Sequence, residues 1–427
     1  MRVLIVTWGS RGDCQPYLAL AAAFQQAGHE VRLAAPPNAQ FSELAAAHGV
    51  AFVPLGPDSG QEVLRGTANQ AISADDPGVS VRLIIDRLLV PALRDMYSTC
   101  LELARWSDVV VSHCVQIVGA AAAEAAGRPC VTGALVPTQI LPVRKRHGRF
   151  PKLWPRSDVP SWSEIAAYKN SVWLPPINET RRMAGLSSLQ DLTTGGFYSS
   201  GLNLVAVSPT VFRRPGDWAP EHRLTGYWLL DTPERWAPSS QVIRFLEEDG
   251  PTIAIGFGSM TSEDSPALTK LVAEAARQAG VRAIIEPGMA GLGAADMPPE
   301  ILVASDVPHA WLLPRVAALV HHGGVGTTAS ALHAGIPSVV VPHVFDQFFW
   351  AERARKLGVA PAPISLKSLT AASLSAAIRK AVEDRKLLER ARRLGEILKH
   401  ERGPEGAVQL VEDYASNCRR AEMPTRI

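Results

Sequence analysis

The chain has 427 residues, which is too long for one ordinary hydrophobic core and predicts two domains. Its composition, 47 % hydrophobic and 20 % charged, is typical of a soluble globular protein. The formal net charge of +2 gives no polyanion-binding signature, so we expect no nucleic-acid partner.

The cysteines and the N-terminus indicate a cytoplasmic protein. The first apolar run is too short for a signal peptide, and no stretch of about twenty apolar residues predicts a membrane span. The cysteines are odd in number, scattered and without C-x-x-C spacing, which argues against a disulfide framework or a structural zinc site and suits a reducing compartment: Cys14, Cys100, Cys114, Cys130 and Cys418.

The first part of the chain alternates predicted strands and helices. Residues 3–8 are an apolar run, as in a parallel strand buried on both faces. The turn 9–13 follows, and then a predicted helix over 16–27 with Pro16 near its first turn. Further elements are predicted as strand 31–35, helix 41–48, strand 50–55, strand 108–112, helix 115–126, strand 129–133 and strand 202–208. This alternation predicts a doubly wound parallel sheet.

Three segments of this half are predicted to be less regular. Residues 56–80 are polar and predict a long loop, and the helical stretch 81–106 should kink or break at Pro91. Residues 135–200 are rich in proline and tryptophan and contain the basic run 144–149. That segment is either an acceptor-binding region whose basic rim could rest on an anionic surface, or a solvated loop with core aromatics.

A second α/β series repeats the pattern of the first. It comprises strand 252–257, helix 267–279, strand 281–285, strand 301–304, strand 317–320, helix 327–334, strand 338–341, helix 346–357 and the final helices over 371–418. Two such halves leave a cleft between the carboxyl ends of their sheets, where these folds bind ligands. The predicted division is 1–214, a Pro-rich linker 215–240, 241–402, and a last helix within 403–427.

The most informative stretch is His321-His322-Gly323-Gly324-Val325-Gly326-Thr327-Thr328. A strand that delivers a glycine turn into a helix N-terminus makes an anion site, because the first-turn N–H groups are free and the helix dipole favours negative charge. Hydroxyls and a histidine add donors. A diphosphate would suit this site. The alternative is an ordinary strand-to-helix turn with a histidine packed beneath it.

Other chemical groups are predicted to face the same cleft. Asp13 follows the first strand and is a candidate general base, with Ser10 and Arg11 as the nearest donors. Asp346 and Gln347 offer the acceptors and donors that a sugar's vicinal hydroxyls need. Either aspartate could instead be a helix N-cap. His309 also follows a strand and points to the cleft.

Several motifs of other enzyme classes are absent from the sequence. It has no His, Cys and Asp cluster with metal-ligand spacing, no Gly-x-Ser-x-Gly and no P-loop. With no evident metal, a leaving diphosphate would have to be neutralised by helix dipoles, His322 and hydroxyls.

Three blocks make the sequence resemble the family 1 glycosyltransferases of the GT-B fold. They are Gly9-Ser10-Arg11-Gly12-Asp13-Cys14-Gln15-Pro16, the 321–328 stretch, and Asp346-Gln347-Phe348-Phe349-Trp350. The resemblance is greatest to the branch with sterol 3-β-glucosyltransferases and bacterial natural-product transferases. It implies two Rossmann-like domains facing across a cleft, with the acceptor bound by 1–214 and the nucleotide sugar by 241–402. The last helix, within 403–427, would cross back onto the first domain.

The resemblance also implies roles for individual residues. Asp13 would deprotonate the acceptor hydroxyl in an inverting, metal-independent transfer. The donor would be held by Ser10, Arg11, Ser259, Val307, His309, His322, Gly324, Val325, Gly326, Thr327, Thr328, Asp346 and Gln347. Among these, Val307 would meet the nucleotide base through its main chain, and Asp346 and Gln347 would hold the sugar.

One departure bears on the donor. Plant members have a glutamate for the ribose hydroxyls where this chain has Ser330, and a tryptophan where it has Val325. Bacterial relatives commonly share both features. The loss of a bidentate carboxylate weakens strict UDP preference and leaves TDP-sugars open.

We therefore expect an O-glycosyltransferase that moves a hexose from UDP or TDP to a hydroxyl of an apolar polyketide, sterol or lipid-like acceptor, with no cofactor and no metal. We expect a monomer or homodimer, with a peripheral membrane contact left open. The alternatives are a sugar-nucleotide epimerase or hydrolase on the same fold, and a non-catalytic sugar-nucleotide-binding helper subunit.

Overall fold

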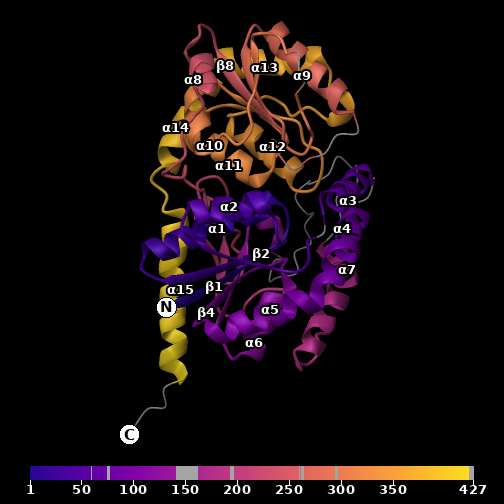
Figure 1. Ribbon diagram of the computed structural model, residues 1–427, viewed down its shortest axis with the longest axis vertical. Helices are drawn as coiled ribbons and strands as arrows, with labels where there is room; N and C mark the ends of the chain where they lie inside the picture. The colour runs from indigo at the N-terminus through magenta and orange to yellow at the C-terminus, as the bar shows by residue number, and fades with distance from the viewer. Residues whose placement is uncertain are drawn as a thin grey trace.

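A computed structural model describes residues 1–58, 60–74, 77–140, 162–192, 197–258, 260, 264–293 and 297–422. Two α/β domains lie one above the other along the long axis (Figure 1), and the final helix runs back beside the first of them. Each domain is built on one parallel sheet.

The first sheet has seven strands, all paired in parallel. Their spatial order is β3 (Ala51–Pro54), β2 (Glu30–Ala35), β1 (Arg2–Val6), β4 (Val109–His113), β5 (Cys130–Ala134), β6 (Asn203–Val205) and β7 (His222–Leu224). The side chains of Val3 to Val6 in β1 are fully buried, and alternate ones enter two separate hydrophobic clusters. The sheet is therefore covered on both faces, as its continuous apolar strands predicted.

The second sheet has five parallel strands. Their order is β10 (Ile301–Val303), β9 (Arg282–Glu286), β8 (Thr252–Gly256), β11 (Leu319–His321) and β12 (Ser338–Val340). The order of the strands reverses between β1 and β4 in one sheet and between β8 and β11 in the other. These two switch points are where such sheets bind ligands, and the predicted doubly wound α/β fold is confirmed.

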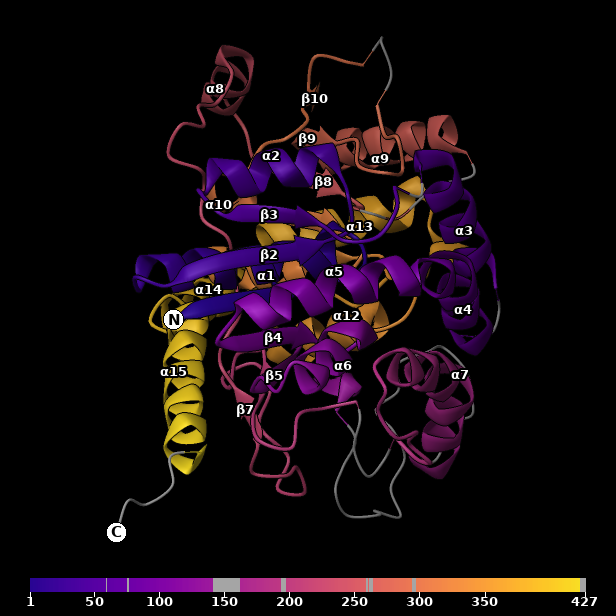
Figure 2. The same cartoon turned by 60° about the horizontal axis from the view of Figure 1, so that its bottom comes forward.

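Helices cover both sheets (Figures 1 and 2). Those of the first domain are α1 (Arg11–Gln26), α2 (Ala39–Ala47), α3 (Gln61–Ser73), α4 (Pro77–Ile84), α5 (Leu93–Trp106), α6 (Ile117–Ala125) and α7 (Trp162–Met183). The later ones are α8 (Ser240–Glu247), α9 (Ser265–Ala279), α10 (His309–Leu312), α11 (Val325–Ala334), α12 (Gln347–Leu357), α13 (Ala371–Glu383), α14 (Arg385–Leu398) and α15 (Gly403–Glu422). No helix in the described part of the chain has the length and apolarity needed to cross a membrane.

The predicted start of the first helix at Pro16 is wrong. Helix α1 begins at Arg11 and contains Pro16 as an internal residue. Proline there costs one intrahelical hydrogen bond, but Ser10 and Asp13 cap the first turn. The predicted turn therefore ends earlier, and Asp13 lies inside the helix and not in a loop.

The predicted loop over 56–80 is also wrong, because α3 and half of α4 lie in it. Both helices are only partly buried, and among their described side chains Thr67, Ala71 and Ser80 are the buried ones. So narrow an apolar face leaves little periodicity to detect. The break expected at Pro91 is confirmed, since a π-helical turn (Ile85–Leu89) and a 3₁₀ turn (Val90–Ala92) separate α4 from α5.

The segment 135–200 is more regular than the sequence predicted. Helix α7 runs through Pro175 and Pro176, and its residues Val172, Trp173 and Ile177 enter the first-domain core. This packing offsets the lost backbone hydrogen bonds. The basic run 144–149 lies outside the described residues.

One strand lies within the predicted linker, and one helix lies within the predicted C-terminal segment 403–427. Strand β7, inside the predicted linker 215–240, pairs with β6 and so belongs to the first sheet. Helix α15 packs its residues Ala407, Val408 and Val411 into the first-domain core. The other boundaries of the predicted division stay predictions.

Candidate functional site

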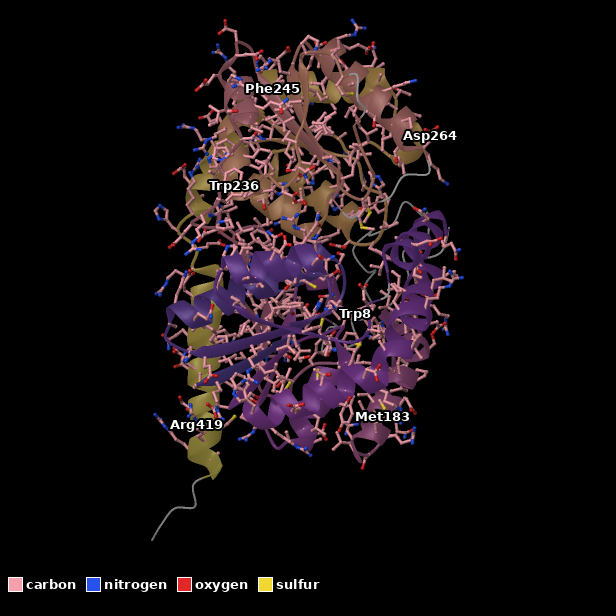
Figure 3. The ribbon with its side chains drawn as sticks, viewed as in Figure 1. Trp8, Met183, Trp236, Phe245, Asp264 and Arg419 are labelled. Atoms are coloured by element: carbon pink, nitrogen blue, oxygen red, sulfur yellow. The ribbon has the colours of Figure 1, made fainter. Side chains whose placement is uncertain are left out.

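The carboxyl ends of both sheets line one cleft of about 2500 Å³. Its lining comes from both domains and includes the turn after β1, the N-terminus of α11 and the loop before α12. Trp8 and Trp236, both labelled in Figure 3, also line this cleft. The cleft lies at the two switch points, so the predicted position of the ligand site agrees with the structure.

Asp13 is the third residue of α1 and lines the cleft. Its Oδ2 accepts hydrogen bonds from the Ser10 backbone N–H at 2.8 Å and from the Ser10 hydroxyl at 3.0 Å. Burial raises the pKa of Asp13 above its ordinary 3.8, and the bonds from Ser10 offset part of that rise. A methyl group at Gly9 would lie 2.4 Å from Oδ2, so glycine is required beside this carboxylate.

The alternative that Asp13 is the helix N-cap is wrong, because Ser10 occupies that position. Asp13 instead reaches back to the N-cap, as the third residue of a capping box does. Asp13 therefore bonds to Ser10 in the first turn of α1 and also lines the cleft.

The N-terminus of α11 faces the cleft with His322 just before it. Val325, Gly326 and Thr327 line the cleft, as do His322 and Gly324. Thr328 does not: its side chain is buried, and its hydroxyl has no partner among the described residues. The predicted donation from the Thr328 hydroxyl to a ligand in the cleft has no support in this geometry.

The His322 ring lies between two glycine backbones. A methyl group at Gly324 would lie 2.4 Å from His322 Nε2, and one at Gly258 would lie 3.0 Å from its Cε1. Burial, with smaller contributions from His343 and His309, lowers the pKa of His322 to about 3. His322 is therefore neutral at physiological pH and offers a hydrogen bond rather than a charge.

His309 differs because it has a carboxylate partner that the sequence did not identify. Its Nε2 lies 3.1 Å from Oε2 of Glu286, at the carboxyl end of β9. Burial alone would lower the pKa of His309, but the charge and hydrogen bond of Glu286 outweigh it and raise the pKa above 6.5. Arg11, from the other domain, acts in the opposite direction. Arg11 and His309 thus provide positive charge from the two walls.

Asp346 lines the cleft just before α12. Burial raises its pKa to about 6, a hydrogen bond at 2.9 Å from Trp350 Nε1 to Oδ2 opposes the rise, and the charge of Asp13 adds to it. The two aspartates therefore lie within electrostatic reach across the cleft. Asp346 is the N-cap residue by position, but no backbone hydrogen bond caps the helix through its side chain, so the predicted alternative role as a cap is not seen.

Gln347 is more occupied than the sequence suggested. Its Oε1 accepts the backbone N–H groups of His343 and Val344 at 2.8 and 3.0 Å. Its Nε2 lies 3.2 Å from Met260 Sδ. Only the NH₂ group is left to donate to a ligand.

The remaining predicted donor residues are Val307 and Ser259, and Ser330 is the position where plant members have a glutamate. Val307 lines the cleft beside His309. Ser330 also lines it, but its hydroxyl donates to the Gly326 carbonyl oxygen at 2.9 Å. Ser259 lies outside the described residues.

Backbone strain gathers at the same cleft. In the described chain, the two non-glycine residues with positive φ are Asp306 at 58° and Phe345 at 52°, and both line it. Such conformations cost about 1–3 kcal/mol each and cluster at functional sites. No group of three or more His, Cys, Asp or Glu side chains arranged for a metal occurs within the described residues.

The first-domain end of the cleft is largely apolar. Helices α3, α4 and α7 surround it, and its lining includes Leu64, Ile85, Met96, Trp173 and Phe197. Figure 2 shows these three helices together at one side of the molecule.

Two family models match the chain. Residues 3–127 match the N-terminal domain of glycosyltransferase family 28, and residues 272–414 match the C-terminal domain of erythromycin biosynthesis protein CIII-like proteins. The first match contains Asp13, and the second contains His309, His322 and Asp346.

Relatives match nearly the whole chain. Sterol 3-beta-glucosyltransferase UGT80B1 of Arabidopsis thaliana is 31% identical, over 96% of this chain and 67% of its own. O-mycaminosyltylonolide 6-deoxyallosyltransferase of Streptomyces fradiae is 30% identical, over 99% of this chain and 100% of its own. The chain spans only 27% of the sterol 3-beta-glucosyltransferase of Candida albicans, at 30% identity.

Solved structures share the fold. Spinosyn rhamnosyltransferase SpnG has a TM-score of 0.68 at 20% identity, covering 96% of this chain and 100% of its own. Glycosyltransferase SsfS6 of Streptomyces sp. SF2575, complexed with thymidine diphosphate, has a TM-score of 0.66 at 19% identity. The match covers 97% of this chain and 99% of the SsfS6 chain. At these identities the likeness concerns the fold alone.

Proposed function

Because the chain belongs to the GT-B glycosyltransferases that include sterol 3-β-glucosyltransferases and macrolide glycosyltransferases, we propose that it is an inverting O-glycosyltransferase with Asp13 as the general base. The donor is a UDP- or TDP-linked hexose, and the acceptor is an apolar molecule with a free hydroxyl. The observation that supports this most is that Asp13 and the α11 N-terminus face one cleft from opposite domains.

The proposed reaction uses groups on both walls. The acceptor oxygen attacks C1 of the sugar as the C1–O bond to the diphosphate breaks, so the configuration at C1 inverts. Asp13 takes the acceptor proton, and the diphosphate leaves with the bonding electron pair. A raised pKa favours this step, because a base works best when its pKa lies nearer the working pH. Asp346 and the NH₂ group of Gln347 hold the sugar hydroxyls.

The α11 N-terminus and its neighbours would stabilise the leaving diphosphate. Free N–H groups and the helix dipole favour an anion there, neutral His322 donates a hydrogen bond, and His309 and Arg11 add positive charge. For the nucleotide, Ser330 offers no carboxylate to the ribose, and the fold relative SsfS6 was solved with thymidine diphosphate. We therefore keep both UDP and TDP donors in the proposal.

The test is Asp13→Asn in a transfer assay with UDP- and TDP-glucose and TDP-rhamnose against a panel of apolar hydroxyl acceptors. General-base catalysis contributes about 10²–10⁴-fold, so turnover should fall by at least about a hundredfold with the nucleotide affinity retained. Asp264→Asn is the matched control, since Asp264 caps α9 away from the cleft (Figure 3) and should keep full turnover.

Three outcomes would contradict the proposal. Near-full turnover of Asp13→Asn would remove Asp13 from the reaction. A new sugar nucleotide or rapid free-sugar release without any acceptor would instead identify an epimerase or hydrolase. Nucleotide binding with neither transfer nor hydrolysis by the wild type would point to a non-catalytic helper subunit.

A further inference from the structure

Helix α7 presents a face with both apolar side chains and one lysine to the apolar end of the cleft. Ile165, Tyr168, Lys169 and Trp173 follow the spacing of one helix face and all line the cleft. Three of them suit an apolar acceptor. Lys169 is the exception and needs a separate explanation, because a lysine ammonium is costly to remove from water.

Lys169 is held by neutral groups. Its Nζ donates to the Gln139 carbonyl oxygen at 2.7 Å and lies 3.3 Å from the Tyr198 hydroxyl. It also lies 5.0 Å from the centre of the Phe197 ring. Among the described residues no carboxylate forms an ion pair with it. Burial lowers the pKa of Lys169 to about 8, so the ammonium form still dominates at neutral pH.

Lys169 and Asp13 line the same cleft. The Cys114 thiol, which follows β4, lies within electrostatic reach of both Lys169 and Asp13. Strand β4 is the direct neighbour of β1, after which Asp13 lies. An acceptor whose hydroxyl reaches Asp13 can therefore place a second substituent at Lys169. An ammonium has three donors, and the two neutral oxygens account for two of them.

We propose that Lys169 is a specificity residue that binds an anionic oxygen substituent of the acceptor, a carboxylate or an ionised phenol. The inference rests on the proposed function and narrows its acceptor class. The acceptor is an apolar ring system with an acidic group, and not a neutral sterol-like alcohol. Trp173 and Phe197, packed edge to face at 5.5 Å between ring centres, form the aromatic wall for its rings.

The test compares 2-naphthol with 6-hydroxy-2-naphthoate, which adds a carboxylate to the same ring system, by calorimetric titration of the full-length protein at pH 7. The wild type should bind the naphthoate at least about tenfold more tightly, because hydrogen bonds between ions are the strong ones. Lys169→Met should lose that preference and keep its affinity for 2-naphthol. Lys169→Arg should retain most of the preference. Lys270→Met, which removes the same charge from an exposed site outside the cleft, should bind both probes as the wild type does.

The inference is overturned if the wild type binds the naphthoate no more tightly than 2-naphthol, or if Lys169→Met keeps the preference. If Lys169→Met fails to fold, Lys169→Gln replaces it, because the glutamine amide can donate to the Gln139 carbonyl oxygen. Lys169→Gln must also lose the preference for the naphthoate. Transfer assays separate this failure from that of the proposed function. Transfer to both probes with equal kcat/KM defeats only the assignment of Lys169, whereas tight naphthoate binding with no transfer to any acceptor defeats the proposed reaction.

Discussion

At the scale of single residues, the His322 ring fits where it does because two neighbouring residues are glycines without side chains. The glycines at 258 and 324 leave room for its ring, and Gly324 has an ordinary φ of −59°. An alanine at 324 is therefore free of backbone strain and acts only through its methyl group. The ring must move if that methyl group is present.

We expect Gly324→Ala to weaken the binding of TDP and UDP by about ten- to a hundredfold, the worth of one hydrogen bond to a charged group. Calorimetric titration measures the dissociation constants. Gly326→Ala is the control for folding, because its added methyl group meets nothing within 4 Å and it should unfold at or above the wild-type temperature. An unchanged affinity in Gly324→Ala would show that His322 does not contact the diphosphate.

Asp346 supports a prediction about pH. Its pKa is about 6 in the folded protein, against an ordinary 3.8, so the folded state holds a proton that the unfolded state has released. The contribution of protonated Asp346 to the free energy of unfolding is fully present below pH 4. It is lost as the pH rises through 6. Asp346→Asn removes this dependence while keeping an oxygen for the Trp350 N–H.

Relative to the wild type, Asp346→Asn should therefore gain at most about 2 kcal/mol of unfolding free energy between pH 4.5 and pH 7.5, less where cleft solvent screens the charge. Urea unfolding at the two pH values measures the gain. A difference between variant and wild type that stays constant with pH would mean that Asp346 titrates normally. Sugar transfer should fall in the same variant, since the proposed function needs this carboxylate.

At the scale of elements, helix α11 depends on a close approach to α14. A methyl group at Gly395 would lie 2.5 Å from Gly335 Cα and 2.8 Å from its nitrogen, both backbone atoms. Backbone cannot rotate away as a flexible side chain can, so the two helices would have to separate. Since α11 presents its N-terminus to the cleft, this contact helps to position the proposed diphosphate site.

Gly395→Ala should destabilise the protein by about 1–3 kcal/mol, the usual cost of overpacking, although alanine favours a helix. Gly406→Ala, in α15, is the matched control because its nearest neighbours are 3.9 Å away and it should be neutral or stabilising. Thermal unfolding of both variants compares them. Equal midpoints would mean that α11 and α14 adjust without cost.

At the scale of the whole molecule, the sequence predicted best what is local. The 321–328 stretch contains a strand end, glycines and a helix start in one run, so its site could be inferred without tertiary contacts. Glu286 is 23 residues from His309, and Lys169 is 30 residues from Gln139. Only the folded chain brings such pairs together. Helices α3 and α7 were missed for the same reason, because packing against the first domain stabilises segments with weak helical patterns.

The two domains are also joined by contacts that no motif predicts. Glu401, between α14 and α15, accepts hydrogen bonds from the Ser208 and Thr210 hydroxyls at 2.7 and 2.8 Å. Arg353 of α12 donates to the Val211 carbonyl oxygen at 2.5 Å. These bonds link the two domains beside the point where the chain crosses into α15.

Removing one of these bonded groups should weaken the contact between the two domains. Glu401→Ala leaves two hydroxyls without their charged acceptor, which is worth about 1.5–3 kcal/mol per bond, so its thermal midpoint should fall and its radius of gyration in solution scattering should rise. Saturating TDP should reverse part of that rise, because a ligand that contacts both walls favours the closed state. Glu405→Ala, an exposed glutamate four residues later, should change neither quantity. If Glu401→Ala matched the wild type in both quantities, the hydrogen bonds of Glu401 would not contribute to holding the two domains together.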